Sequence, residues 1–206
     1  MVPTVPLPRR SLDTSDARRW YENELGWATV PDSGTAGLPL RLVAGLRFDV
    51  LTVPAQAGDA ALRHRGRSRA PGSPVALSGD RMLLLVAAGS ADELPGLLDW
   101  LEWGRLTPDL GAIGAGGHIE APRPPGFPVT ADCSPGCSPG RTNPQGAAVW
   151  LRPPETGCGR EIPLPTMSAL GGVGGAPDLV RLVDTLATQC HRIRLRRACA
   201  QPLAFS

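Results

Sequence analysis

The chain has 206 residues, with 21 basic and 19 acidic side chains and a net charge of +2. Charged residues make up 19% of it and apolar residues 42%, which excludes a disordered polyelectrolyte. Glycine (25) and proline (23) are abundant, but no Gly-X-Y period is present, so a collagen-like chain is excluded as well. A chain of this length can bury a substantial core, and we expect one domain with a tail.

The apolar pattern also bears on the compartment. No apolar run approaches the roughly 18–20 residues that cross a membrane. The Pro-rich start, residues 1–10, lacks the apolar region of a secretory signal. We therefore expect a cytoplasmic protein that has no membrane partner.

Five cysteines are present. Their odd number and the expected reducing compartment argue against a disulfide framework. Cys133, Cys137, Cys158 and the Cys190-His191 pair could in principle assemble a four-ligand zinc site. Because no second closely spaced ligand pair accompanies the CxxxC turn, free thiols are the favoured interpretation.

Hydrophobic periodicity and turn residues predict the elements in chain order. The expected helices are 11–25, 59–63, 91–103 and 177–197, and the expected strands are 27–30, 46–53, 75–77, 82–87, 118–120 and 147–151. In the strand 46–53, Leu46, Phe48 and Val50 alternate with Arg47, Asp49 and Leu51. The strands are short and follow no strict β-α-β rhythm, so the class is expected to be α+β.

These elements divide the chain into four expected parts. Residues 1–10 form a flexible lead, and 11–151 form the main domain, with an irregular Pro/Gly-rich loop at 122–147. Residues 152–176 are a Pro/Gly-rich link, and 177–206 are a basic helix and tail. Motifs typical of P-loop nucleotidases, helical zinc proteases and serine hydrolases are missing from the sequence.

Four segments in a particular order resemble the bifunctional primase/polymerase (Prim-Pol) N-terminal domain of the archaeo-eukaryotic primase superfamily. They are 17–31, with its aromatic helix and Gly-Trp; 45–58, a buried strand between glycines; 79–86, a turn entering a strand; and 109–122, an Asp followed by Gly-Gly and Ala-Pro. The resemblance covers roughly residues 17–151. It implies a mixed sheet with flanking helices, and a two-metal nucleotidyl transferase that uses Mg²⁺ or Mn²⁺.

The residues at the implied active-site positions depart from the family pattern. Alignment on the proline that ends the buried strand places Leu51 and Val53 where the resemblance implies two metal-binding carboxylates, and neither can ligate a cation. Asp49, one step earlier on the same face, is a candidate displaced ligand. Met82 replaces the nucleotide-binding His, and Asp109 keeps the third acidic position.

Both carboxylates also have non-catalytic interpretations. Asp49 could face solvent or pair with Arg47, and Asp109 could be a turn or helix-cap residue after Pro108. We expect that catalysis has been lost and that no cofactor is needed. An active enzyme using Asp49 and Asp109 as catalytic and metal-binding residues is the alternative.

Arginines supply the expected contacts to nucleic acid or phosphate, because guanidinium groups neutralise phosphates. The candidates are Arg63, Arg65, Arg67 and Arg69 in one cluster, Arg192, Arg194, Arg196 and Arg197 in a second, and Arg47 and Arg81 near the degenerate site. We thus expect a DNA- or nucleotide-binding module with a regulatory role in gene expression, development or secondary metabolism. A protein-interaction adaptor on the same scaffold is a further alternative.

Overall fold

A five-stranded antiparallel sheet is the centre of the fold. The structure, a computed structural model, describes residues 14–31, 39–65, 73–106, 108–126, 148–155, 162, 164–167 and 179–199. The strand order is β5 (Gly111–Ile113), β2 (Asp49–Pro54), β4 (Arg81–Val86), β3 (Val75–Ser78), β7 (Val149–Arg152). β1 (Arg41–Val43) and β6 (His118–Glu120) form a separate antiparallel pair. The expected α+β class is confirmed.

The expectation of a mixed sheet is wrong for the part of the chain that the structure describes. All ladders between its named strands are antiparallel. The one parallel pairing found there is an isolated bridge between Arg123 and Val149. Antiparallel neighbours such as β3 and β4 need only a tight turn between them, and the short Ser78–Arg81 connection provides it.

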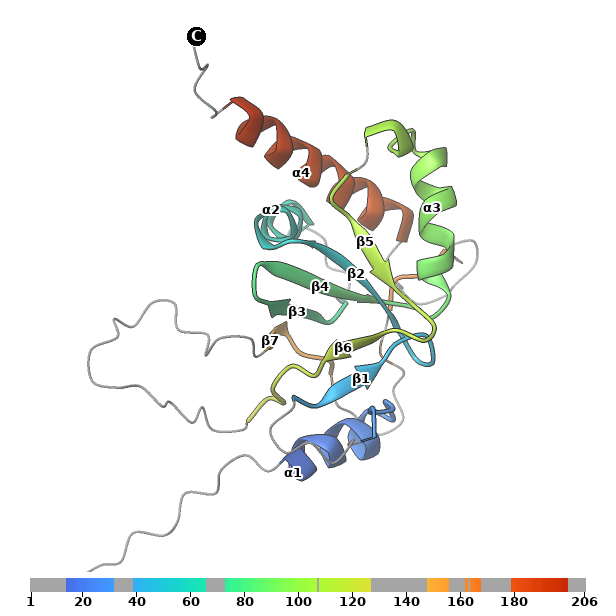
Figure 1. Ribbon diagram of the computed structural model, residues 1–206, viewed down its shortest axis with the longest axis vertical. Helices are drawn as coiled ribbons and strands as arrows, with labels where there is room; N and C mark the ends of the chain where they lie inside the picture. Colours follow the sequence, from blue (N-terminus) through green and yellow to red (C-terminus); the bar gives the residue numbers. More distant parts are fainter. Residues whose placement is uncertain are drawn as a thin grey trace, which may run out of the picture.

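Helices cover one face of the sheet. They are α2 (Ala55–Arg65), α3 (Ser90–Trp100) and α4 (Leu179–Cys199), with the short 3-10 helix η2 (Gly104–Leu106) after α3. On the other face lie the β1–β6 pair and the N-terminal α1 (Thr14–Arg19), which continues into the π-helical turn η1 (Trp20–Glu24) (Figure 1). Among the described helices, none has the length and apolar character required to cross a membrane.

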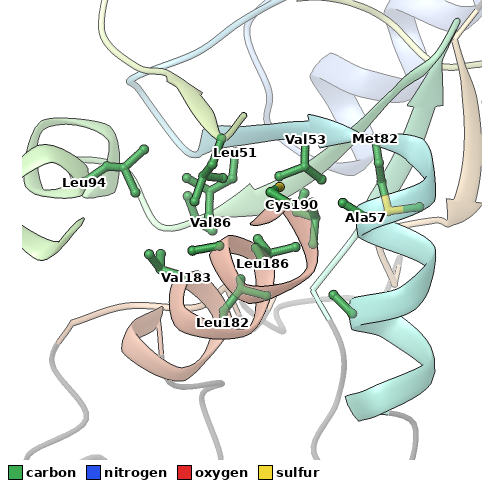
Figure 2. Close-up of a cluster of buried hydrophobic side chains, with 14 of the residues drawn as sticks. Leu51, Val53, Ala57, Met82, Val86, Leu94, Leu182, Val183, Leu186 and Cys190 are labelled. Carbon is green, nitrogen blue, oxygen red and sulfur yellow. The ribbon is translucent and has the colours of Figure 1, made fainter. Parts of the chain in front are cut away.

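The helix-covered face holds the larger hydrophobic core. Leu51 and Val53 of β2 meet the apolar stripe of α4, in which Leu182, Leu186 and Cys190 are buried (Figure 2). Ala57 of α2, Leu94 of α3, and Met82 and Val86 of β4 belong to the same cluster (Figure 2). The basic C-terminal helix therefore packs on the sheet as part of the same core.

An aromatic cluster fills the opposite face. Tyr21 is fully buried, with Trp20 edge-on at a centroid distance of 4.8 Å and Trp27 stacked at 6.1 Å. The Tyr21 hydroxyl donates to the carbonyl of Pro122 and accepts a 3.1 Å hydrogen bond from the Trp150 indole. Burial raises the pKa of Tyr21 far above its usual value, because the phenolate would lose its hydration. This cluster connects the N-terminal helical segment to β7, an edge strand of the sheet.

Several predicted elements are confirmed within the described residues. The β3–β4 hairpin, α3, α4, β6 and β7 lie within a few residues of their expected bounds, and residues 14–24 are helical as expected. The apolar stripe of α4 is buried from Leu179 to Cys190, with Ile193 half-buried. Residues 127–147 of the expected loop at 122–147, and most of the expected link at 152–176, lie outside the described residues.

Other predictions need correction. Residues 27–30 form a single bridge, Thr29 to Leu42, rather than a strand. β2 begins at Asp49, not at residue 46, because residues 44–47 bend. α2 begins at Ala55 and runs through Gly58, where a break was expected. A Cβ at this glycine would lie 2.2 Å from the Met82 sulfur, so the glycine permits close packing of α2 on β4.

Candidate functional site

Asp49 is buried and caps a helix. Its side chain is 1% exposed, and Oδ2 accepts a 2.8 Å hydrogen bond from the backbone N–H of Ala91, at the start of α3. The residue at the usual capping position is Gly89, which has no side chain to offer. Asp49 supplies the missing acceptor from β2, and its negative charge is favourable at a helix N-terminus. The interpretation of Asp49 as a solvent-facing or Arg47-paired carboxylate is therefore wrong.

Asp109 lies in a different environment. It is exposed, and Oδ1 lies 2.6 Å from Nη1 of Arg81. Arg81 also donates 3.3 Å hydrogen bonds to the carbonyl and the hydroxyl of Thr52. Thr52 is opposite Gly111 in the β2–β5 ladder, so Asp109 lies beyond that end of the paired region.

The structure does not bring Asp49 and Asp109 together. Asp49 lies three residues along β2 from Thr52, or about 10 Å at ~3.3 Å per residue. Asp109 comes two residues before Gly111, so it lies further from Asp49 than Thr52 does. Two carboxylates of one metal site must both reach the same ion at about 2 Å. Asp49 and Asp109 therefore do not form the shared divalent-metal site that the catalytic alternative requires.

The positions implied for the other two carboxylates are equally buried. Leu51 and Val53 are 0% exposed, and they pack under α4 in the core (Figure 2). Within the described residues, no group of three or more His, Cys, Asp or Glu side chains is placed to hold a metal ion. Cys133, Cys137 and Cys158 of the possible zinc set lie outside those residues.

Cys190 of that set lies in the core. It is 3% exposed, and its thiol donates to the backbone carbonyl of Asp109 at 3.4 Å. Burial, with the nearby Asp109 carboxylate as a second cause, raises the pKa of the Cys190 thiol to about 11. The thiol is therefore protonated at neutral pH, and metal binding needs the thiolate.

Arg63 of the first arginine cluster and three arginines of the second line a cleft between α2 and α4. The cleft has a volume of about 410 Å³ and is lined by one face of each helix. The lining residues of α2 are Gln56, Asp59, Ala60 and Arg63, and those of α4 are Gln189, Arg192, Ile193, Arg196 and Arg197. Their spacings of three and four residues place each set on a single helix face. We refer to this site as the basic cleft.

The basic cleft carries an excess of positive charge. Four guanidinium groups line it against one carboxylate, that of Asp59. All four arginines are exposed, and among the described residues none of them forms an ion pair. The C-terminus of α4 contributes about half a negative charge, which is small beside the net charge of the arginines. An anion is therefore attracted to this cleft.

The remaining candidate arginines lie elsewhere. Arg194 does not line the basic cleft, and its Nη1 donates to the carbonyl of Leu106 at 2.8 Å. Arg81 is engaged with Asp109, and Arg47 is exposed on the bend before β2. Arg65 ends α2, while Arg67 and Arg69 lie outside the described residues. Of the ten candidates, the structure thus brings Arg63, Arg192, Arg196 and Arg197 together.

Sequence reasoning missed the uncharged part of the cleft. Gln189 is 8% exposed and is one of the few buried polar residues in the described chain. It lies on the Arg192 and Arg196 face of the helix, three and seven residues before them. A glutamine beside the apolar stripe of an otherwise well-patterned helix was the signal that could have identified it.

The lining chemistry is suited to binding. Guanidinium groups can hold phosphate oxygens in bidentate fashion, and a carboxamide can both donate and accept hydrogen bonds. The described lining residues include no Ser, Cys or His that could serve as a nucleophile or its base.

No family model, curated protein or solved structure matches the chain.

Proposed function

We propose that this protein is a nucleic-acid-associated binding module with a regulatory role, and that it binds phosphate groups in the basic cleft. The observation that carries the proposal is the convergence of Arg63 from α2 with Arg192, Arg196 and Arg197 from α4. Arg63 is far from the other three arginines in the sequence, yet all four line one cleft. Phosphate neutralisation by arginine gives sequence-independent affinity that falls with salt.

The scaffold in this proposal is a degenerate primase/polymerase-like domain. The order of the resembling segments suggests it, and the positions of Leu51 and Val53 under α4 give a physical reason for the loss of catalysis. A catalytic site would need carboxylates at these two positions to ligate the metal ions. This chain has apolar side chains there, and they stabilise the core. Asp49 serves as a helix cap. On this view the fold was kept for binding while the metal site was lost.

Fluorescence anisotropy with labelled single- and double-stranded oligonucleotides tests the proposal. The Arg192→Gln/Arg196→Gln variant removes two charges from the basic cleft. At about 50 mM salt we expect about tenfold weaker binding, because two exposed ion pairs contribute up to about 1 kcal/mol each and ~1.4 kcal/mol is tenfold.

A matched control is Arg105→Gln/Arg152→Gln. Both residues are exposed, and neither lines the basic cleft. This variant loses the same net charge, so it should bind with nearly wild-type affinity. Equal losses in the two variants would show that bulk charge governs binding, which contradicts a site in the cleft.

A further inference from the structure

The unusual feature of the basic cleft is a buried glutamine. Gln189 is 8% exposed, and within the described residues its carboxamide forms no hydrogen bond. Its polar atoms are not sealed in the protein interior either, so they open toward the cleft that the residue lines. Water can satisfy them in the free protein, and a ligand that offers a donor and an acceptor can replace that water.

A glutamine is not the residue that would best stabilise this position. Leu182, Leu186 and Cys190 on the same helix are buried apolar or weakly polar residues, and a leucine in place of Gln189 would bury apolar surface with no polar group to satisfy. A departure from the hydrophobic pattern at a buried site is typical of a functional position. The chemistry of the carboxamide therefore indicates what the cleft binds.

From the surroundings of Gln189 we infer that the basic cleft binds one nucleotide unit of a single strand and that the carboxamide reads the edge of its base. This inference rests on the function proposed above. The arginines would hold the phosphate, and the side chains of Ala60 and Ile193 offer a small apolar wall beside the base. The volume of about 410 Å³ is at the lower end of the range for small-molecule sites, which limits the cleft to about one nucleotide.

The base expected here is adenine. A glutamine side chain can pair in bidentate fashion with the N6 amino group and N7 of adenine, because it offers an acceptor and a donor side by side. On the corresponding Hoogsteen edge thymine offers only the O4 acceptor beside its methyl group, so a carboxamide that reads this edge pairs with adenine through two hydrogen bonds and with thymine through one. A single strand is expected because its unpaired bases can be splayed into a cleft of this size.

Anisotropy titrations with labelled homo-oligomers of deoxyadenosine and of deoxythymidine, at about 50 mM salt, test the inference. The wild-type protein should bind the deoxyadenosine oligomer at least about fivefold more tightly. In Gln189→Leu, which conserves side-chain volume, this ratio should fall to about one while the salt dependence of binding is unchanged. Thermal unfolding of the variant verifies that it is folded, and leucine should not lower its stability.

The outcomes separate the inference from the proposed function. If wild type binds both oligomers with equal affinity, or if Gln189→Leu keeps the preference, base reading by Gln189 is wrong and phosphate binding in the cleft still stands. If a duplex of the same sequence binds as tightly as the single strand, the single-strand assignment is wrong. If neither oligomer binds at low salt, both the inference and the proposed function are overturned.

Discussion

Replacement of Asp49 by alanine tests the assignment of this carboxylate as a helix cap. The substitution removes the acceptor that lies 2.8 Å from the N–H of Ala91. Loss of a capping side chain costs about 0.5–2 kcal/mol, and a buried donor left without a partner costs about 1–3 kcal/mol. These two figures describe the same loss and do not add. Oδ1 of Asp49 is itself buried without a hydrogen-bond partner in the described residues, so its removal offsets part of the cost.

We therefore expect Asp49→Ala to lower the free energy of unfolding by about 1–2 kcal/mol. For a protein of this size that corresponds to a fall in Tm of about 2–8 °C. Asn is nearly as good a cap as Asp, so Asp49→Asn should stay within about 1 kcal/mol of wild type. Oligonucleotide binding should be unchanged in both variants, because Asp49 does not line the basic cleft.

Differential scanning calorimetry with and without Mn²⁺ provides the readout. An unchanged Tm in Asp49→Ala would refute the capping role. A Tm that rises with Mn²⁺ in wild type and not in Asp49→Ala would show instead that Asp49 ligates the ion. That result would return the residue to a metal site and favour the catalytic alternative.

Three further predictions concern the packing of the fold. Gly58→Ala should destabilise the protein by about 1–3 kcal/mol in urea unfolding, because the new Cβ would clash with Met82, and an unchanged midpoint would contradict the close approach. Tyr21→Phe should cost about 1–3 kcal/mol, since it leaves the Trp150 indole without its acceptor, and wild-type stability would argue against this bond. Cys190, whose pKa is raised to about 11, should resist alkylation in the native protein at neutral pH and react after unfolding, as peptide mass spectrometry can measure. Because folding raises the pKa of this thiol from 9.0, the stability that the protonated thiol contributes is complete below about pH 9. It is lost as the pH rises toward about 11.

Much of the fold could be predicted because its signals are local. The apolar stripes of α3 and α4 have the helical period, and the turn at Gly79 marks the β3–β4 hairpin. β1 and β5 were not predicted, since strands of three residues show no measurable period. The first turn of α2 was missed because Gly58 reads locally as a breaker. The glycine is instead required by a tertiary contact, because it allows α2 to approach Met82 closely.

The candidate site was less predictable than the fold. The arginine clusters were visible in the sequence, but nothing local shows that α2 and α4 pack side by side and bring them together. The capping of α3 by Asp49 is also non-local, because 42 residues separate Asp49 from Ala91. Such contacts depend on the strand order. An alternating pattern assigns residues to the two faces of a strand, but it does not show that helices cover the face that carries Asp49 or which N–H the carboxylate contacts.

The salt dependence of single-strand binding tests the central claim most directly. A nucleotide unit held in the basic cleft brings one phosphate on each side, so the slope of log K against log salt should be about −1.4 for a single strand, at ~0.7 per neutralised phosphate. Arg192→Gln/Arg196→Gln should reduce its magnitude by about 0.7, while Arg105→Gln/Arg152→Gln should leave it unchanged. A slope that is the same in wild type and in both variants would contradict phosphate binding in the basic cleft.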